Sequence, residues 1–344
     1  MGIKAGAEMT TFEMRFIALR CKDTIAPTGT LAQGAGAKQI NSLGEVYETK
    51  YGLTTSERVY GTVNENIEGR GPCYLRTEGI SQEASEDLKK AYLNMAPSQT
   101  LKWIESGKNP SEQNVEIEGT EPYIVGGHTA SGYWVDTKRR TTVKGLYAAG
   151  DVAGGCPQKY VTGALAEGEI AALTAISELG EISAIDESDI ERHLSEVTDF
   201  LYGNIDGTFT TEQLEEAMQK VMDQYAGGIA TDYQYNEERL VIGKKRIGEL
   251  LDMIDELKAK DMFELKDIYE VRERLIVCQT LIEHLGARKE TRWHSFGENT
   301  DYPEESNQWL KYVNSKRKPD GGTEIIFREL VTGGKVYECT DFTE

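Results

Sequence analysis

Three short segments with glycines hold the polar side chains that could do chemistry in this sequence. Arg70 lies between two glycines and just before Pro72, so a tight loop would hold a guanidinium that could bind an anion or handle a proton. The alternative is a surface ion pair, the default for a lone arginine.

His128 follows Gly126-Gly127, which permit close backbone approach to a ligand. A histidine can donate to developing negative charge, although a hydrogen-bonded structural histidine is the alternative.

The third segment is the run 143–151, which ends in Gly150-Asp151. Its apolar residues predict a buried parallel strand whose end delivers Asp151 to a ligand-facing edge. A buried carboxylate is costly unless it accepts hydrogen bonds. Hydroxyl groups of a ligand could supply them, and capping the next turn is the alternative role. An alanine-rich helix from Gly163 to Leu179 should follow, with small residues that permit close approach.

Other elements must position these segments. Strand formers from Phe12 to Cys21 predict a buried strand, and a further strand pair is expected around 41–48. Ser81 is a candidate N-cap for a helix to Leu93, and a second short helix should cover 98–106. Apolar residues at three- and four-residue steps predict two long helices over 240–257 and 265–285 that pack as an antiparallel pair. The tail, 323–330 with 335–340, resembles a hairpin.

Composition limits the partners. With 58 acidic and 38 basic residues, the net charge of -20 disfavours nucleic acid and anionic membranes. No apolar run is long enough to span a membrane and no signal peptide is evident, so we expect a cytoplasmic protein without membrane insertion. The five cysteines form no Cys-x-x-Cys pair, which argues against disulfides and against a metal site in this chain alone.

Four stretches, taken in order, carry a family resemblance. They are Glu68-Gly69-Arg70-Gly71-Pro72, then 121–128 ending in His128, then 145–155 with Gly150-Asp151, and finally 287–292 with 301–303 and 307–311. Together they resemble the fumarate reductase and succinate dehydrogenase flavoprotein family, and within it the adenylylsulfate (APS) reductase alpha subunits.

Two departures favour APS reductase over fumarate reductase. The chain lacks the His-Pro-Thr that many fumarate reductases have near 17–19, and Lys159 stands where they have an arginine. A lysine ammonium cannot grip a carboxylate at two points as a guanidinium does. The histidine segment also departs from the usual APS reductases around 129–132, which leaves the substrate open.

The resemblance implies an α/β (α+β) fold with a partial FAD-binding domain, a capping region and a C-terminal helical bundle. The expected domains are 1–115 (capping), 116–182 (FAD-binding) and 183–344 (helical). It implies that Arg70 and His128 are catalytic, that Arg20 and Lys159 bind substrate, and that FAD contacts Gly150, Asp151, Gly163 and Ala164. Arg70 and His128 should face one electropositive cleft.

The implied activity is FAD-mediated reduction of APS to sulfite and AMP, with electrons from a ferredoxin-like iron–sulfur subunit. Action on a dicarboxylate and a noncatalytic assembly role are the alternatives. The sequence has no strand followed by Gly-x-Gly-x-x-Gly and a helix, the unit that normally holds the FAD pyrophosphate. We therefore expect a fragment that binds little FAD and is inactive alone, and a further partner would be a separate chain with that N-terminal unit.

Overall fold

The computed structural model describes residues 1–15, 17–28, 30–52, 55–122, 130–154, 160–180, 186–198, 209–292 and 297–330. The chain divides into two compact units. Unit 1 comprises Met1–Phe16, Pro122–Thr291 and Asn299–Glu344, and unit 2 comprises Ile17–Glu121 and Arg292–Glu298. Each unit is considered by itself. The predicted domain boundaries stay a prediction.

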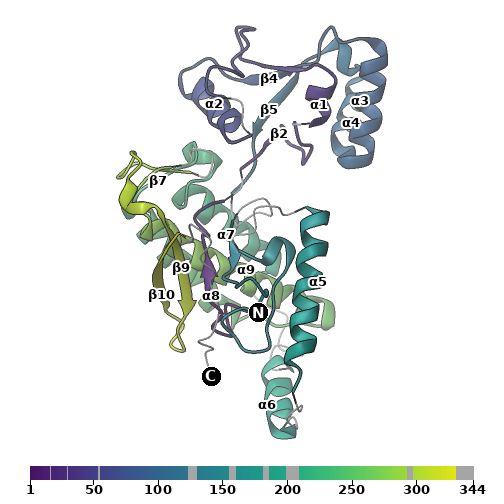
Figure 1. The fold of residues 1–344 in the computed structure, drawn as a ribbon. Coiled ribbons are helices and arrows are strands. Elements are labelled where there is room, and N and C mark those ends of the chain that lie inside the picture. Colours follow the sequence, from purple (N-terminus) through teal and green to yellow (C-terminus); the bar gives the residue numbers. More distant parts are fainter. Residues whose placement is uncertain are drawn as a thin grey trace. The chain divides into compact units, whose positions relative to one another are not determined.

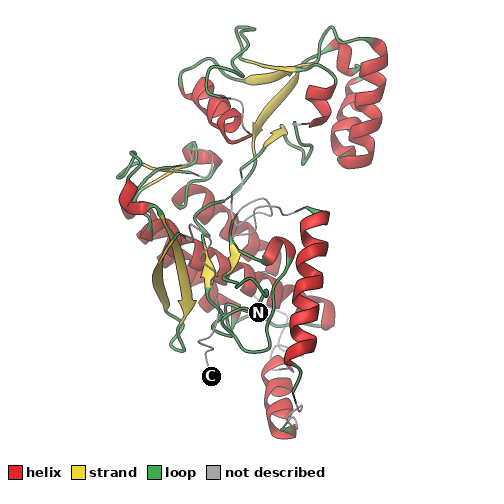
Figure 2. Ribbon diagram, viewed as in Figure 1, coloured by secondary structure: helices red, strands yellow, loops and turns green. Residues whose placement is uncertain are grey.

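Unit 2 is an antiparallel sheet flanked by helices (Figures 1 and 2). The strand order is β2 (Leu19–Cys21), β5 (Val115–Gly119), β4 (Cys73–Arg76) and β3 (Lys38–Ile40). Alternate residues of β5 are buried, as expected for a strand with one face on the core. The remaining elements are α1 (Thr30–Gly34), α2 (Thr55–Ile67), α3 (Gln82–Met95), α4 (Pro97–Ser106) and η1 (Pro110–Glu112).

Helix α3 begins where the sequence predicts. The Ser81 hydroxyl accepts a hydrogen bond from the Ala84 amide at 3.1 Å, which satisfies one of the amides that a helix start leaves without an intrahelical partner. The helix predicted over 98–106 is also confirmed as α4.

Unit 1 is built on a helical bundle. Its main helices are α7 (Thr211–Tyr225), α8 (Glu237–Ile254) and α9 (Met262–Ala287). Gly243 near the start of α8 lies against Ile282 near the end of α9, and Lys244 Nζ lies 2.5 Å from Glu283 Oε1. The two helices therefore run antiparallel, as predicted. Their apolar stripes form one buried core with α7.

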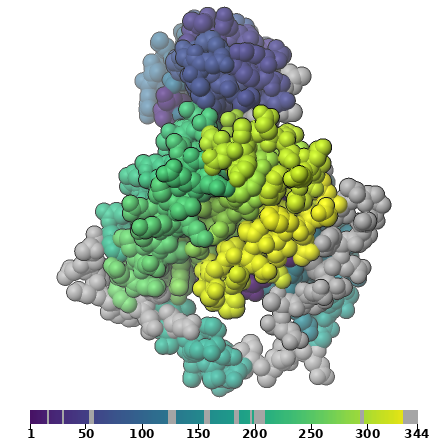
Figure 3. Space-filling view, turned by 90° about the vertical axis from the view of Figure 1, so that its left-hand side faces the viewer, coloured from purple at the N-terminus to yellow at the C-terminus, as the bar shows by residue number. Residues whose placement is uncertain are grey.

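A second sheet and further helices complete unit 1. The strand order is β10 (Thr323–Glu329), β9 (Lys311–Arg317), β1 (Met9–Thr10) and β6 (Gly132–Tyr133). In Figure 3 the yellow β9–β10 hairpin lies against green helices of the bundle. The other elements are α5 (Val161–Glu178), α6 (Glu187–Thr198), η2 (Gly150–Val152), η3 (Ile229–Thr231), η5 (Asn307–Trp309), β7 (Gln234–Tyr235) and β8 (Glu298–Asn299).

The strand predicted from Phe12 to Cys21 is wrong in extent. Among the described residues of that range, only Leu19–Cys21 is strand, and β1 precedes the predicted start. Thr11 has a positive φ of 53°, which turns the chain out of β1. The Phe12 amide then donates to His284 Nδ1 at 3.2 Å, so a side chain takes the place of a strand partner.

The buried parallel strand predicted before Gly150 is also wrong. The amide of Thr141 donates to the Leu146 carbonyl at 3.0 Å and that of Leu146 to the Val143 carbonyl at 3.1 Å. These backbone groups therefore form turns and leave no strand ladder. The described parallel pairing in this region is a single bridge between Tyr133 and Ala153.

The first strand of the predicted tail hairpin is present as β10, and it forms a hairpin with the segment before it. Thr323–Glu329 pairs with Lys311–Arg317, which precedes it, through a turn at 318–322. Residues 335–340, the predicted partner, lie outside the described residues.

Candidate functional site

Arg70 lies in a loop that its glycines shape. The loop joins the end of α2 to β4, and Gly69 has a φ of 76°, a conformation that glycine adopts without strain. A Cβ on Gly71 would lie 1.9 Å from Oδ1 of Asn66, so glycine is also needed there unless Asn66 moves. The Arg70 carbonyl accepts hydrogen bonds from both the amide and the hydroxyl of Ser42, each at 2.8 Å.

The Arg70 guanidinium is held by a carboxylate from the preceding helix. Nε donates to Glu65 Oε2 at 2.5 Å and Nη2 donates to Glu65 Oε1 at 2.7 Å. Glu68 pairs with the same Nη2. The hydrogen bonds to Glu65, and then those to Glu68, raise the pKa of Arg70 above its usual value. Among the described residues Nη1 has no hydrogen-bond partner, so this nitrogen is available to a ligand.

Glu65 is the buried centre of this cluster. Its side chain is 1% exposed, and besides Arg70 it accepts hydrogen bonds from Asn41 Nδ2 at 2.9 Å, Lys50 Nζ at 2.9 Å and the Tyr51 hydroxyl at 3.0 Å. The hydrogen bond from Arg70 is the largest cause that holds the pKa of Glu65 well below its usual range, against the opposing effect of burial. Glu65 is therefore ionised and fixes the plane of the guanidinium.

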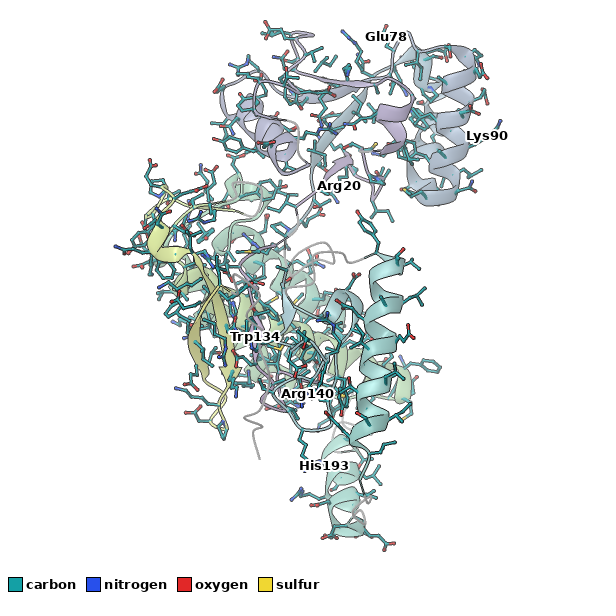
Figure 4. The ribbon with its side chains drawn as sticks, viewed as in Figure 1. Arg20, Glu78, Lys90, Trp134, Arg140 and His193 are labelled. Carbon is teal, nitrogen blue, oxygen red and sulfur yellow. The ribbon has the colours of Figure 1, made fainter. Side chains whose placement is uncertain are left out.

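Arg20, which is labelled in Figure 4, lies in β2. Its guanidinium is also held by carboxylates. Nε donates to Glu118 Oε1 at 3.2 Å, and Nη2 pairs with Glu121. Burial alone would lower the pKa of Arg20, but the hydrogen bonds to Glu121 and Glu118 outweigh it and raise the pKa. In the part of unit 2 that the structure describes, Nη1 of Arg20 also has no partner. Both predicted arginines are thus ion-paired, which reduces the positive charge that they offer.

The predicted flavin-binding residues of unit 1 lie together at the start of α5. Gly150 has a φ of 70°, and a Cβ there would lie 3.2 Å from the Ala164 Cβ. The Gly150 amide donates to Glu167 Oε2 at 2.9 Å, which ties η2 to the helix. Asp151 is exposed. Gly163 lies in the first turn of α5, one residue before Ala164.

Two further glycines hold the Gly150-Asp151 segment against the sheet. A Cβ on Gly132 would lie 2.3 Å from the Val152 carbonyl oxygen, and one on Gly154 would lie 2.8 Å from the Tyr133 carbonyl oxygen. The Gly154 amide donates to that same Tyr133 oxygen at 2.7 Å. Backbone packs on backbone here, so glycine is required at both positions.

Two predicted site residues, His128 and Lys159, lie outside the described residues. Arg70 and Arg20 belong to unit 2, whereas Gly150, Asp151, Gly163 and Ala164 belong to unit 1. The shared electropositive cleft for Arg70 and His128 therefore stays a prediction.

Sequence reasoning missed a buried polar cluster in unit 1. Glu13 Oε1 accepts from Arg288 Nε at 2.8 Å, and Glu13 Oε2 lies 3.1 Å from His284 Nδ1. His284 Nε2 lies 2.8 Å from the Ser315 hydroxyl, and Arg288 Nη1 donates to Glu290 at 2.9 Å. Burial would raise the pKa of Glu13, but His284 and Arg288 outweigh it and lower the pKa. The cluster joins the N-terminal segment to α9 and β9.

Among the described residues no group of His, Cys, Asp and Glu is arranged to hold a metal ion. None of the described helices is long and apolar enough to cross a membrane.

The chain is similar to flavoprotein subunits over nearly its whole length. It is 28% identical to "Adenylylsulfate reductase subunit alpha" of Megalodesulfovibrio gigas, over 96% of this chain and 59% of that protein. It is 28% identical to an uncharacterized FAD-dependent oxidoreductase of Methanocaldococcus jannaschii, over 91% of this chain and 57% of the relative. No family model matches the chain.

Solved structures of flavoproteins show the same similarity. Adenylylsulfate reductase from Archaeoglobus fulgidus superposes with a TM-score of 0.86 at 30% identity, over 96% of this chain and 61% of that one. Quinol fumarate reductase from E. coli gives a TM-score of 0.77 at 17% identity, over 98% and 62% of the two chains, and shows a shared fold. These comparisons confirm the predicted resemblance and fold class. The chain spans about three fifths of the length of these relatives.

Proposed function

We propose that this chain, a relative of the adenylylsulfate reductase alpha subunits and of the fumarate reductase flavoproteins, supplies the substrate-side part of an FAD-dependent adenylylsulfate reductase. The observation that carries the proposal is the match to a solved adenylylsulfate reductase, with a TM-score of 0.86 at 30% identity over 96% of the chain. The proposed reaction adds two electrons to APS and breaks the bond between its sulfur and the bridging oxygen. Sulfite and AMP are the products.

Arg70 is the first proposed catalytic residue. Glu65 orients the guanidinium through two hydrogen bonds, which leaves Nη1 to donate to a substrate oxygen. A donor fixed before the substrate arrives needs no reorganisation as charge develops. His128 is proposed to donate to a second oxygen of the same group.

Arg20 and Lys159 are proposed to bind the substrate. Arg20 is held by Glu118 and Glu121, so its part would be to orient an anionic group through Nη1 and not to add a free positive charge. Lys159 would supply a point charge.

The residues at the start of α5 fit a flavin. A Cβ on Gly150 would press on Ala164, so glycine keeps this turn close to the start of α5. The small residues Gly163 and Ala164 leave room beside the backbone. The exposed Asp151 carboxylate would accept hydrogen bonds from ribityl hydroxyls. Bound flavin, in its reduced form, would pass the two electrons of the reaction to the substrate.

An iron–sulfur subunit is the proposed electron source, because adenylylsulfate reductase and fumarate reductase relatives are named as subunits of larger enzymes. We also propose that the 344 residues bind FAD weakly and are inactive by themselves. They contain no Gly-x-Gly-x-x-Gly turn, and that turn would hold the pyrophosphate at a helix N-terminus.

A substrate-dependence assay tests the proposal. The chain would be mixed with FAD and with a separately expressed N-terminal nucleotide-binding unit of the M. gigas alpha subunit, and reduction of ferricyanide would be followed. In the oxidative direction we expect reduction that needs both sulfite and AMP. Reduction with succinate alone would favour the dicarboxylate alternative, and flavin-loaded protein without activity on either would favour an assembly role.

A further inference from the structure

The turn that follows β3 holds the main chain of Arg70. Asn41 and Ser42 come directly after the last residue of this strand, Ile40. The amide and the hydroxyl of Ser42 both donate to the Arg70 carbonyl, each at 2.8 Å. Because one residue supplies both donors, the backbone of Arg70 is fixed relative to this turn.

Asn41 closes the turn and also reaches Glu65. It is 2% exposed. Its Oδ1 accepts hydrogen bonds from the amides of Leu43 and Glu45, each at 3.0 Å. Its Nδ2 donates to Glu45 Oε2 and to Glu65 Oε2, each at 2.9 Å. An asparagine amide has two donor hydrogens and two acceptor lone pairs, so all four are used here.

The two oxygens of Glu65 have different donors. Oε1 accepts hydrogen bonds from Lys50, from Tyr51 and from Nη2 of Arg70. Among the described residues, the donors to Oε2 are Nε of Arg70 at 2.5 Å and Nδ2 of Asn41. Arg70 is the largest cause of the lowered pKa of Glu65, and Asn41 is the next hydrogen-bond donor, against the opposing effect of burial. Asn41 therefore keeps Oε2 in place against the three donors on Oε1.

We propose that Asn41 is a positioning residue for Arg70. It fixes the Glu65 carboxylate, and through that carboxylate it sets the direction in which Nη1 of Arg70 points. The inference rests on the proposed function, which assigns Nη1 to a substrate oxygen. Ser42 holds the backbone of Arg70 and Asn41 orients its side chain, so a single turn controls both.

An amide is required at position 41. Asn41→Asp keeps the shape of the side chain but removes both donors, and it adds a negative charge beside the carboxylates of Glu45 and Glu65. Neighbouring carboxylates repel each other. Glu65 should then turn away from position 41, and the guanidinium of Arg70 should turn with it.

Nuclear magnetic resonance of isotope-labelled arginine side chains tests this inference. The Nε–H signal of Arg70 would be identified by its loss in Arg70→Lys, and its exchange with water would be measured. Asn41→Asp should speed this exchange by at least about 10-fold, because the acceptor of a charged hydrogen bond is no longer fixed. Sulfate, used as a tetrahedral anion, should shift the wild-type signal to saturation. Asn41→Asp should raise the dissociation constant for sulfate by about 10-fold.

Glu45→Gln is the matched control. It alters the other carboxylate partner of Asn41 in the same turn and leaves the hydrogen bond to Glu65. The Arg70 signal and the affinity for sulfate should therefore stay as in the wild type. Circular dichroism would show that each variant folds. If Asn41→Asp does not fold, Asn41→Ser replaces it, since a serine hydroxyl has one donor hydrogen.

Each outcome decides the role of Asn41. Faster Nε–H exchange in the Asn41 variant alone supports positioning. An Arg70 signal that the Asn41 variant leaves unchanged, or that Glu45→Gln changes equally, overturns it. If the Asn41 variant speeds the exchange but sulfate never shifts the wild-type signal, Asn41 positions Arg70, and the result counts against the proposed function of Arg70 alone.

Discussion

At the level of the residue, the guanidinium groups of Arg70 and Arg20 are held in the same way. Each guanidinium donates through Nε and Nη2 to carboxylates of its own unit, and Nη1 remains without a partner in the described part of the chain. Carboxylate support fixes the orientation of a guanidinium but neutralises part of its charge. An anion at either proposed site residue should therefore be recognised by geometry more than by net positive field.

The Glu65–Arg70 pair should matter for the stability of unit 2. Replacing Glu65 with Gln keeps the shape but removes the charge that Arg70, Lys50 and Tyr51 all contact. We expect local destabilisation of about 1–3 kcal/mol, the cost of leaving such partners poorly satisfied. Hydrogen exchange of peptides from 55–76 would measure it. The matched control is Glu68→Gln, since the Glu68 side chain is 47% exposed and should contribute about 0–1 kcal/mol. Equal effects of the two variants would contradict the central role of Glu65.

The same pair predicts a pH dependence. Folding lowers the pKa of Glu65 from an ordinary value of 4.5, so its stabilising contribution is fully present above the unfolded pKa and is lost as the pH falls through the folded one. The stability difference between the wild type and Glu65→Gln should therefore shrink as the pH falls from about 6 to about 3. Hydrogen exchange of peptides from 55–76, measured over that pH range, gives the stability difference. A stability difference that grew as the pH fell would contradict the lowered pKa of Glu65.

At the level of the element, the α8–α9 pair is the main core of unit 1. Leu275 is fully buried, whereas Leu250 is partly buried at the edge of the same core. The apolar stripes of the two helices form the pairing, and Gly243 gives room to α7, because a Cβ there would lie 3.0 Å from the Tyr225 Cβ.

Leu275→Ala should therefore cost about 2–5 kcal/mol, from lost apolar burial and the cavity left behind. Leu250→Ala should cost less, because part of its side chain already meets water. The shift in urea midpoint at constant slope measures both. If Leu250→Ala proved the more damaging, the helices would not pack as the structure has them.

The elements that could be predicted are those whose signals are local. The Ser81 cap and the stripes of α8 and α9 depend on residues a few positions apart. The strand before Gly150 could not be judged this way, because a strand exists only if another segment pairs with it, and these backbone groups form turns instead. The cluster of Glu13 with His284 was missed because those residues are 271 positions apart in the sequence. Glu65 was missed as the partner of Arg70 for a different reason, since only the turn after α2 brings the two together.

At the scale of the whole molecule, the proposal needs two parts of a flavoprotein. These 344 residues hold the resemblance to substrate-side motifs, and about two fifths of the length of the relatives lies outside the similarity. The affinity for FAD should then depend on both parts of the flavoprotein.

The visible absorbance spectrum tests this most directly. The chain would be incubated with FAD, desalted and measured, alone and with the M. gigas nucleotide-binding unit. We predict a colourless protein alone, because no phosphate-binding turn is present, and a retained flavin spectrum only when the unit is added. Stoichiometric flavin on the chain by itself, or none on the complex, would contradict the account.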